Sequence, residues 1–174
     1  MADLRLPQKY NIKLEIIEMR KLILADGVSD APAPYIFIKI GDITAQTQVK
    51  KGDSPTVDEK FDFTLYIYPD ELKNLKILFQ VYHKTVFYKS DLLIGTHSLD
   101  VWTVYVKATH MINKTWAILE HEESGNINTG YLKFSVICIA ESDKMPGINY
   151  LFTKLLLEMT MRKKKLEERK MLKK

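Results

Sequence analysis

Apolar and polar residues alternate strictly near the N-terminus of the chain. Ile12, Leu14 and Ile16 are separated by polar residues, which is the period-two pattern typical of a strand with one buried face. Further runs rich in β-branched and aromatic residues follow, and breaks rich in Gly, Pro, Asp and Ser separate them. The pattern predicts eight strands and one helical turn, the strands at residues 10–17, 34–40, 43–49, 60–67, 75–82, 92–99, 115–119 and 131–140 and the turn at 100–107.

The spacing of these strands indicates the fold class. No long helical period lies among them. Short strands separated by turn-rich breaks favour an all-β, antiparallel, eight-stranded β-sandwich over alternating β/α units. We expect Trp116 and Cys138 in its core, and we expect function in the loops at residues 26–33, 51–55 and 83–91.

The C-terminal segment has a different pattern. After Pro146-Gly147, apolar residues recur at the spacing of one helix face, and this predicts an amphipathic α-helix over residues 146–174. The predicted stripe consists of Ile148, Leu151, Phe152, Leu155, Leu156, Met159 and, two turns later, Leu166. An isolated helix gains little stability unless its apolar face is packed. The stripe therefore either packs back on the sandwich or contacts a partner, which is a groove, another helix or a bilayer surface.

Charge is distributed unevenly along the chain. The formal net charge is +4, but residues 162–174 contribute +6 and leave −2 (+4 minus +6) on the first 161 residues. The basic side chains of this tail are Arg162, Lys163, Lys164, Lys165, Arg169, Lys170, Lys173 and Lys174. A basic tail favours acidic protein partners or an anionic membrane surface. It lacks the interleaved aromatic residues of a base-stacking surface, so nucleic acid is not favoured as a partner.

Composition places the chain among ordinary globular proteins. Of its 174 residues, 46% are hydrophobic and 28% are charged, which suits one domain with a core and an appendage. We divide it into an N-terminal extension (1–8), the sandwich (9–142) and the basic helix (146–174). The sequence has neither a run of about 18 apolar residues nor the apolar region of a secretory signal, and Cys138 has no second cysteine to pair with. We therefore expect a cytoplasmic protein, with a place peripheral to a membrane or the cytoskeleton as the alternative.

The sequence does not favour catalysis. The four histidines lack the spacing of zinc ligands, and no Gly-rich phosphate loop is present. Cys138 lies within an apolar run, where a small core residue is the expected role. We predict that the protein is not an enzyme and has neither a cofactor nor a small-molecule substrate.

The loop between the strands predicted at 75–82 and 92–99 is a candidate binding site. Ca²⁺ takes about six to eight oxygen ligands, whereas this loop carries one carboxylate, Asp91. Asp91 is therefore only a weak metal candidate, as are Asp26 and Asp30 in the loop at 26–33. We predict instead a contact loop made of Lys84, Val86, Phe87, Tyr88 and Lys89. An aromatic tip flanked by lysines suits an anionic membrane or a pocket on a partner. The alternative is that Phe87 folds back over the end of the sandwich.

The order of several segments resembles a C2 domain. The segments that carry this resemblance are Pro34-Tyr35-Ile36, residues 54–63, and residues 78–82 followed by Asp91-Leu92-Leu93-Ile94-Gly95. Within that family, residues 104–105, 110, 114–119 and 130–133 resemble the second C2 domain of a ferlin. Ferlins are long chains with many C2 domains. The resemblance to them implies a β-sandwich that acts in membrane traffic.

The sequence departs from the calcium-binding members of the family. The resemblance implies one acid directly before the Pro-Tyr pair and two after the strand that ends at Tyr82, but this chain has Ala33, His83 and Thr85 there. The family's lysine-rich strand, which binds phosphoinositide headgroups, is largely replaced by Gln46-Thr47-Gln48. We therefore expect a protein that folds without metal and does not respond to calcium.

Two functions follow from these features. The first is a non-catalytic, calcium-independent scaffold or adaptor subunit, attached to a larger protein assembly partly through its C-terminal helix. The second is a peripheral membrane module that binds anionic phospholipid through the loop at 83–91 and the basic tail, as the resemblance to ferlins implies.

Overall fold

The computed structural model describes residues 6–24, 31–85, 90–121, 125 and 127–143. The chain divides into two compact units, Met1–Ser142 and Asp143–Lys174. The helix predicted for residues 146–174, with its apolar stripe and its basic side chains, lies outside the described residues.

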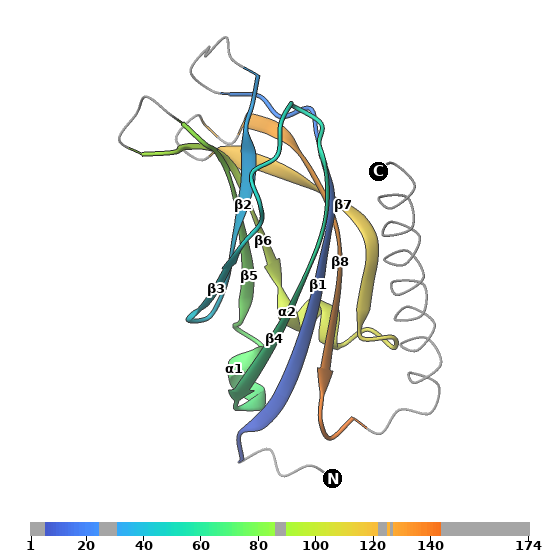
Figure 1. Cartoon of the computed structure of the whole chain (residues 1–174). Helices are drawn as coiled ribbons and strands as arrows, with labels where there is room; N and C mark the ends of the chain where they lie inside the picture. The colour runs from blue at the N-terminus through green and yellow to red at the C-terminus, as the bar shows by residue number, and fades with distance from the viewer. Residues whose placement is uncertain (1–5, 25–30, 86–89, 122–124, 126, 144–174) are drawn as a thin grey trace, which may run out of the picture. The chain divides into compact units, whose positions relative to one another are not determined.

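Eight strands and two short helices make up the described part of the chain (Figure 1). In chain order they are β1 (Gln8–Arg20), β2 (Pro34–Ile40), β3 (Ile43–Gln46), β4 (Thr56–Ile67), α1 (Pro69–Leu72), β5 (Lys76–His83), β6 (Leu92–Asp100), α2 (Val101–Tyr105), β7 (Met111–His121) and β8 (Ile127–Ala140). Every strand pair is antiparallel. The prediction of an all-β, eight-stranded antiparallel fold is confirmed.

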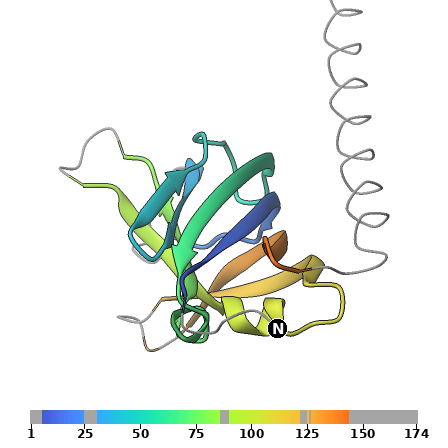
Figure 2. The ribbon, with the colours of Figure 1, turned by 90° about the horizontal axis from the view of Figure 1, so that it is seen from below.

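The strands pair in the order β3-β2-β5-β6-β7-β8-β1-β4. The ladder nearly breaks in the middle, because β6 and β7 share one register pair, Thr96 with Glu120. The eight strands therefore form two four-stranded layers, β3-β2-β5-β6 and β7-β8-β1-β4, which face each other in a sandwich (Figure 2).

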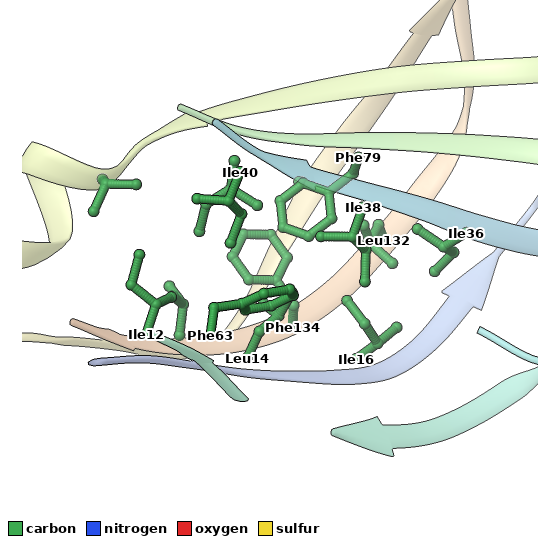
Figure 3. Close-up of a cluster of buried hydrophobic side chains, with 14 of the residues drawn as sticks. Ile12, Leu14, Ile16, Ile36, Ile38, Ile40, Phe63, Phe79, Leu132 and Phe134 are labelled. Atoms are coloured by element: carbon green, nitrogen blue, oxygen red, sulfur yellow. The ribbon is translucent and has the colours of Figure 1, made fainter. Parts of the chain in front are cut away.

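The core lies between these two layers. Alternate side chains of each strand point inward, as the period of two requires. The buried cluster that results includes Ile12, Leu14, Ile16, Ile36, Ile38, Ile40, Phe63, Phe79, Leu132 and Phe134 (Figure 3). The rings of Phe79 and Phe134 meet across the layers with their centroids 5.0 Å apart. Cys138 is buried in the same cluster, as its position in an apolar run predicted.

One core prediction is wrong. Trp116 is 40% exposed, because it points to the outer face of β7, while Ala117 and Leu119 point inward and are buried. The run Trp116-Ala117-Ile118-Leu119 is apolar on both faces of the strand, so periodicity alone does not tell which face is buried.

Element boundaries also differ from the predictions. β1, β4 and β7 all extend beyond the predicted ranges, because partner strands continue the ladder past the strictly alternating residues. β3 is shorter and ends at Gln46. The predicted helical turn at 100–107 is present as α2, whereas α1 was not predicted.

Candidate functional site

The loops between β1 and β2, β3 and β4, and β5 and β6 gather at one end of the sandwich, which we call the loop end. The described parts of these loops lie opposite α1 and α2 (Figure 1). The segment before β2 joins them through backbone hydrogen bonds. Gly52 N–H donates to the Pro32 carbonyl at 2.7 Å, and Lys84 N–H donates to the Ala33 carbonyl at 2.9 Å. Both neighbouring loops are thereby fixed to the entry of β2.

Asp91 is the centre of a hydrogen-bond network at the loop end. The Tyr35 hydroxyl donates to Asp91 Oδ2 at 2.8 Å, and Lys84 Nζ lies 3.1 Å from the same oxygen. The Thr85 N–H donates to Asp91 Oδ1 at 3.1 Å. The Asp91 side chain is 17% exposed. Both of its carboxylate oxygens therefore have protein donors, one from β2 and two from the loop between β5 and β6.

The protonation states of this network follow from its contacts. Burial acts to raise the pKa of Asp91, but the hydrogen bonds from Thr85, Tyr35 and Lys84 outweigh burial, and the pKa lies below its ordinary value. Burial, together with the Asp91 carboxylate, raises the pKa of Tyr35 to about 12. At neutral pH the carboxylate is thus ionised and the phenol is a donor.

His83 has a structural partner at the same end. The Ala33 N–H donates to His83 Nδ1 at 2.9 Å, so this nitrogen is the unprotonated one. The imidazole is buried at the end of β5, opposite Pro34 of β2. His83 therefore fixes the backbone that leads into β2.

The lysines after β3 are the next candidates for a ligand contact. Lys50 Nζ lies 3.0 Å from Glu59 Oε1, and both carboxylate oxygens of Glu59 accept the Gln48 N–H. Thr47 is buried, and its Oγ1 accepts the Ile36 N–H at 2.9 Å. This segment thus closes the side of the sandwich between β3 and β4, and Lys50 is paired within the protein.

The predicted site residues are only partly within the described chain. Asp91 and Lys84 come together in the network above. Asp26, Asp30 and the loop residues Val86, Phe87, Tyr88 and Lys89 lie outside the described residues, as do the apolar stripe and the basic tail. Among the residues that are described, no group of three or more His, Cys, Asp or Glu side chains is placed to hold a metal ion. No helix in the described ranges is long and apolar enough to cross a membrane.

A second surface was missed by the sequence analysis. Trp116 and Ile118 are exposed next to each other on the outer face of β7. The Arg20 guanidinium and the Lys133 ammonium lie 5.0 and 5.1 Å from the centre of the Trp116 ring. The signal that could have revealed this surface is the run that is apolar on both faces, because one of those faces must point away from the core.

Comparison with known proteins identifies relatives of the chain. A model of the C2 domain family matches residues 10–119. Myoferlin from Xenopus tropicalis is 28% identical over 141 residues, which cover 80% of this chain and 7% of that protein. Ferlin 2 from Tetrahymena thermophila is 33% identical over 142 residues, which cover 80% of this chain and 8% of that protein. The chain thus spans less than a tenth of the length of these relatives.

Solved structures show the same fold at lower identity. The C2A domain of plant Extended Synaptotagmin 1 has a TM-score of 0.59 at 17% identity and covers 80% of this chain and 100% of its own. The C2A- and C2B-domains of Extended-Synaptotagmin 2 have a TM-score of 0.61 at 13% identity and cover 79% of this chain and 41% of theirs. At these identities the likeness concerns the fold alone.

Proposed function

Because the chain belongs to the C2 domain family and has ferlins among its relatives, we propose that it is a non-catalytic, calcium-independent interaction module. In this proposal it serves as a scaffold or adaptor subunit of a larger protein assembly and is attached partly through the segment at 146–174. The observation that carries the proposal is the Asp91 network, in which protein donors take both oxygens of the carboxylate at the loop end.

Calcium independence is supported by the chemistry of this network. Ca²⁺ needs about six to eight oxygen ligands, and its affinity follows the number of charged ones. To bind it, Asp91 would have to release the Tyr35 hydroxyl and the Thr85 N–H, and the ion would lie close to the Lys84 ammonium. Ala33 and His83 stand where the family resemblance implies further acids. Both the ligand count and the local charge therefore disfavour the ion.

The non-catalytic part of the proposal is supported by the roles of the titratable groups. A general base must reach the substrate proton that it abstracts. His83 instead accepts a backbone N–H, and Asp91 is committed to three donors. The His110 ring contacts the Tyr105 carbonyl. These groups hold loops and turns in place.

Attachment to an assembly is supported by the pattern of the C-terminal segment. The stripe from Ile148 to Met159 presents six apolar side chains at helical spacing, and burying one such side chain contributes about 1.5–3 kcal/mol. Four or five of them would contribute about 6–15 kcal/mol, which is comparable to the association cost of roughly 4–15 kcal/mol, so affinity requires most of the stripe. The basic residues that follow increase the encounter rate with an acidic partner.

The second candidate function is a peripheral membrane module of the cytoplasm. Two observations favour it: the ferlin relatives and the basic tail next to an apolar stripe. Lys and Arg near an anionic bilayer contribute about 1 kcal/mol each. In this alternative the loop at 83–91 and the tail bind phospholipid, and the module lies at a membrane or at the cytoskeleton beneath it.

One experiment separates the two candidates. The full chain is compared with a stripe variant, Leu151→Asp/Leu155→Asp, and with a tail variant in which Lys163, Lys164 and Lys165 are changed to Gln. Thr153→Asp/Leu157→Asp is the matched control, because it has the same spacing and charge on the other side of the predicted helix. Each protein is assayed by co-purification from native extract and by flotation with phosphatidylserine liposomes.

We expect the stripe variant to lose its protein partners, the control to retain them, and the parent to float poorly. Salt-sensitive flotation of the parent that the tail variant abolishes, with no protein partner recovered, would establish the membrane module instead. Equal loss of partners in the stripe variant and in its control would refute attachment through the stripe.

A further inference from the structure

The two layers of the sandwich part between β6 and β7. Beyond the single register pair Thr96 with Glu120, an open groove of about 540 Å³ lies between the strands. Residues 96–98 of β6 form one wall, and Trp116 to Ile118 together with Glu120 of β7 form the other. We call this the seam groove.

Three of the four residues of the β7 wall are apolar, and Trp116 among them is held in place from outside. Trp116 and Ile118 are 40% and 48% exposed. Arg20 and Lys133 lie over the Trp116 ring, and both donate hydrogen bonds to Glu18, with Arg20 Nη2 at 3.0 Å and Lys133 Nζ at 2.9 Å. Cations at these distances attract the ring face. The indole is therefore oriented before anything binds, so that little side-chain entropy is lost when it is covered.

The same wall is a strand edge. The Thr96 hydroxyl donates to the Glu120 carbonyl at 3.3 Å, and the His97 ring is hydrogen-bonded to the backbone of Ile118. These side chains of β6 occupy positions that ladder bonds take in a continuous sheet. Alternate residues of an antiparallel strand turn their backbone groups to the same side, so the Trp116 N–H and C=O also face the groove. An edge of this kind can add an extended peptide as a further strand.

Among the described residues that line the groove, the charge comes from one carboxylate, because the Arg20 and Lys133 cations beside Trp116 are both paired with Glu18. Glu120 is exposed and is the only Asp, Glu, Lys or Arg among the described residues that line the groove. His97 stacks near Phe79 with ring centroids 6.2 Å apart, and burial lowers its pKa despite the hydrogen bond to Ile118 and the nearby Glu120. At neutral pH the ring is uncharged, and the lining carries a single negative charge.

We propose that the seam groove binds an extended peptide segment of a protein partner. The segment adds along the β7 edge at Trp116, places an apolar or aromatic side chain on Trp116 and Ile118, and directs a neighbouring Lys or Arg toward Glu120. A volume of about 540 Å³ lies within the range of about 300–1,000 Å³ that is usual for ligand sites. The proposal uses residues of the first unit alone, so it can fail without the proposed function failing, and the reverse also holds.

A displayed library of random 12-residue peptides, panned against the full chain, tests the proposal. We expect enrichment of sequences that combine an apolar or aromatic residue with Lys or Arg. The enriched peptides are then titrated by fluorescence anisotropy against the parent and its variants. Ile118→Asp should weaken binding at least about tenfold, the effect of removing one central apolar contact. Glu120→Lys should reverse the preference from basic to acidic peptides. Tyr66→Asp is the matched control, because Tyr66 is exposed on the outer face of β4, and this variant should bind as the parent does.

Thermal melting of each variant shows that it is folded, and Ile118→Thr, which keeps the β-branched shape, replaces Ile118→Asp if that variant does not fold. Failure to enrich any peptide overturns the proposal. Equal affinity of folded Ile118 variants and parent also overturns it. Flotation with phosphatidylserine liposomes that Ile118→Asp abolishes, without peptide binding, assigns the surface to lipid and overturns it as well.

Discussion

Replacing Asp91 by Asn tests the interpretation of the loop end directly. The substitution keeps the side chain's shape but leaves one acceptor oxygen where there were two, and it places an NH₂ group against the donors Tyr35, Lys84 or Thr85. A hydrogen bond to a charged group contributes about 1.5–3 kcal/mol, whereas an ion pair with an exposed lysine contributes about 0–1 kcal/mol. The Lys84 side chain is 55% exposed, so the Tyr35 and Thr85 bonds dominate.

We expect Asp91→Asn to lower the free energy of unfolding by about 2–3 kcal/mol. For a domain of this size, that corresponds to a fall in melting temperature of roughly 4–12 °C. Circular dichroism melts at pH 7 measure the difference. The matched control is Asp62→Asn, which removes an exposed carboxylate 3.8 Å from Lys13 and should change the melting temperature by less than about 2 °C.

The pH dependence of this difference has a definite sign. The pKa of Asp91 is lower in the folded protein than in the unfolded chain, so the folded state favours the ionised form. Its contribution is complete above the unfolded pKa of about 4 and is lost as the pH falls through the folded pKa. The gap between Asp91→Asn and the parent should therefore narrow below about pH 4.

A calcium titration separates a structural carboxylate from a metal ligand. An ion that binds only the folded state must raise the melting temperature. We expect no shift for the parent or for Asp91→Asn in millimolar Ca²⁺. A rise of several degrees in the parent that is absent in Asp91→Asn would make Asp91 a ligand and refute the reasoning, as would a variant that melts with the parent at pH 7.

Two further predictions concern Tyr35 and the core. Because the folded protein raises the pKa of Tyr35 to about 12, the contribution of its hydroxyl to stability is complete below the unfolded pKa of about 10 and is lost as the pH rises toward 12. The free energy of unfolding of Tyr35→Phe should thus be about 1 kcal/mol below that of the parent at pH 8 and should approach it at pH 11.5. Phe79→Ala should lower the free energy of unfolding by about 3–5 kcal/mol, because its ring is buried against Phe134. Trp116→Ala should lower it by only about 1–2 kcal/mol, because Trp116 is exposed. Equal losses of this free energy in chemical denaturation would contradict the assignment of faces.

The fold could be predicted from local pattern where one face of a strand is polar. Ile12, Leu14 and Ile16 alternate with polar residues, and all three are buried. The pattern carried no such information at Trp116, where both faces of the strand are apolar. Strand ends were also missed, since pairing across the sheet extends β4 back to Thr56.

The chemistry of the loop end depends on contacts between distant parts of the sequence. Asp91 could be identified as a lone acid, but its donor Tyr35 lies 56 residues away, and no local spacing connects the two. The hydrogen bond of His83 with Ala33 likewise depends on the register of β2 with β5. The seam groove arises from the loss of pairing between β6 and β7, which depends on the twist of two layers and has no signature in either strand alone.

A loop end built on Asp91 responds to its surroundings differently from one built on clustered acids. Several carboxylates close together repel one another until a cation binds, so such a loop end changes its charge and stability with calcium. Asp91 has the Lys84 ammonium 3.1 Å away, so this pair is already neutral. Burial and the Asp91 carboxylate keep Tyr35 protonated well above neutral pH. Because charge and geometry here are set by the protein alone, we expect binding at this end to depend on the concentration of the partner and on ionic strength, and we expect a change in calcium to leave it unaltered.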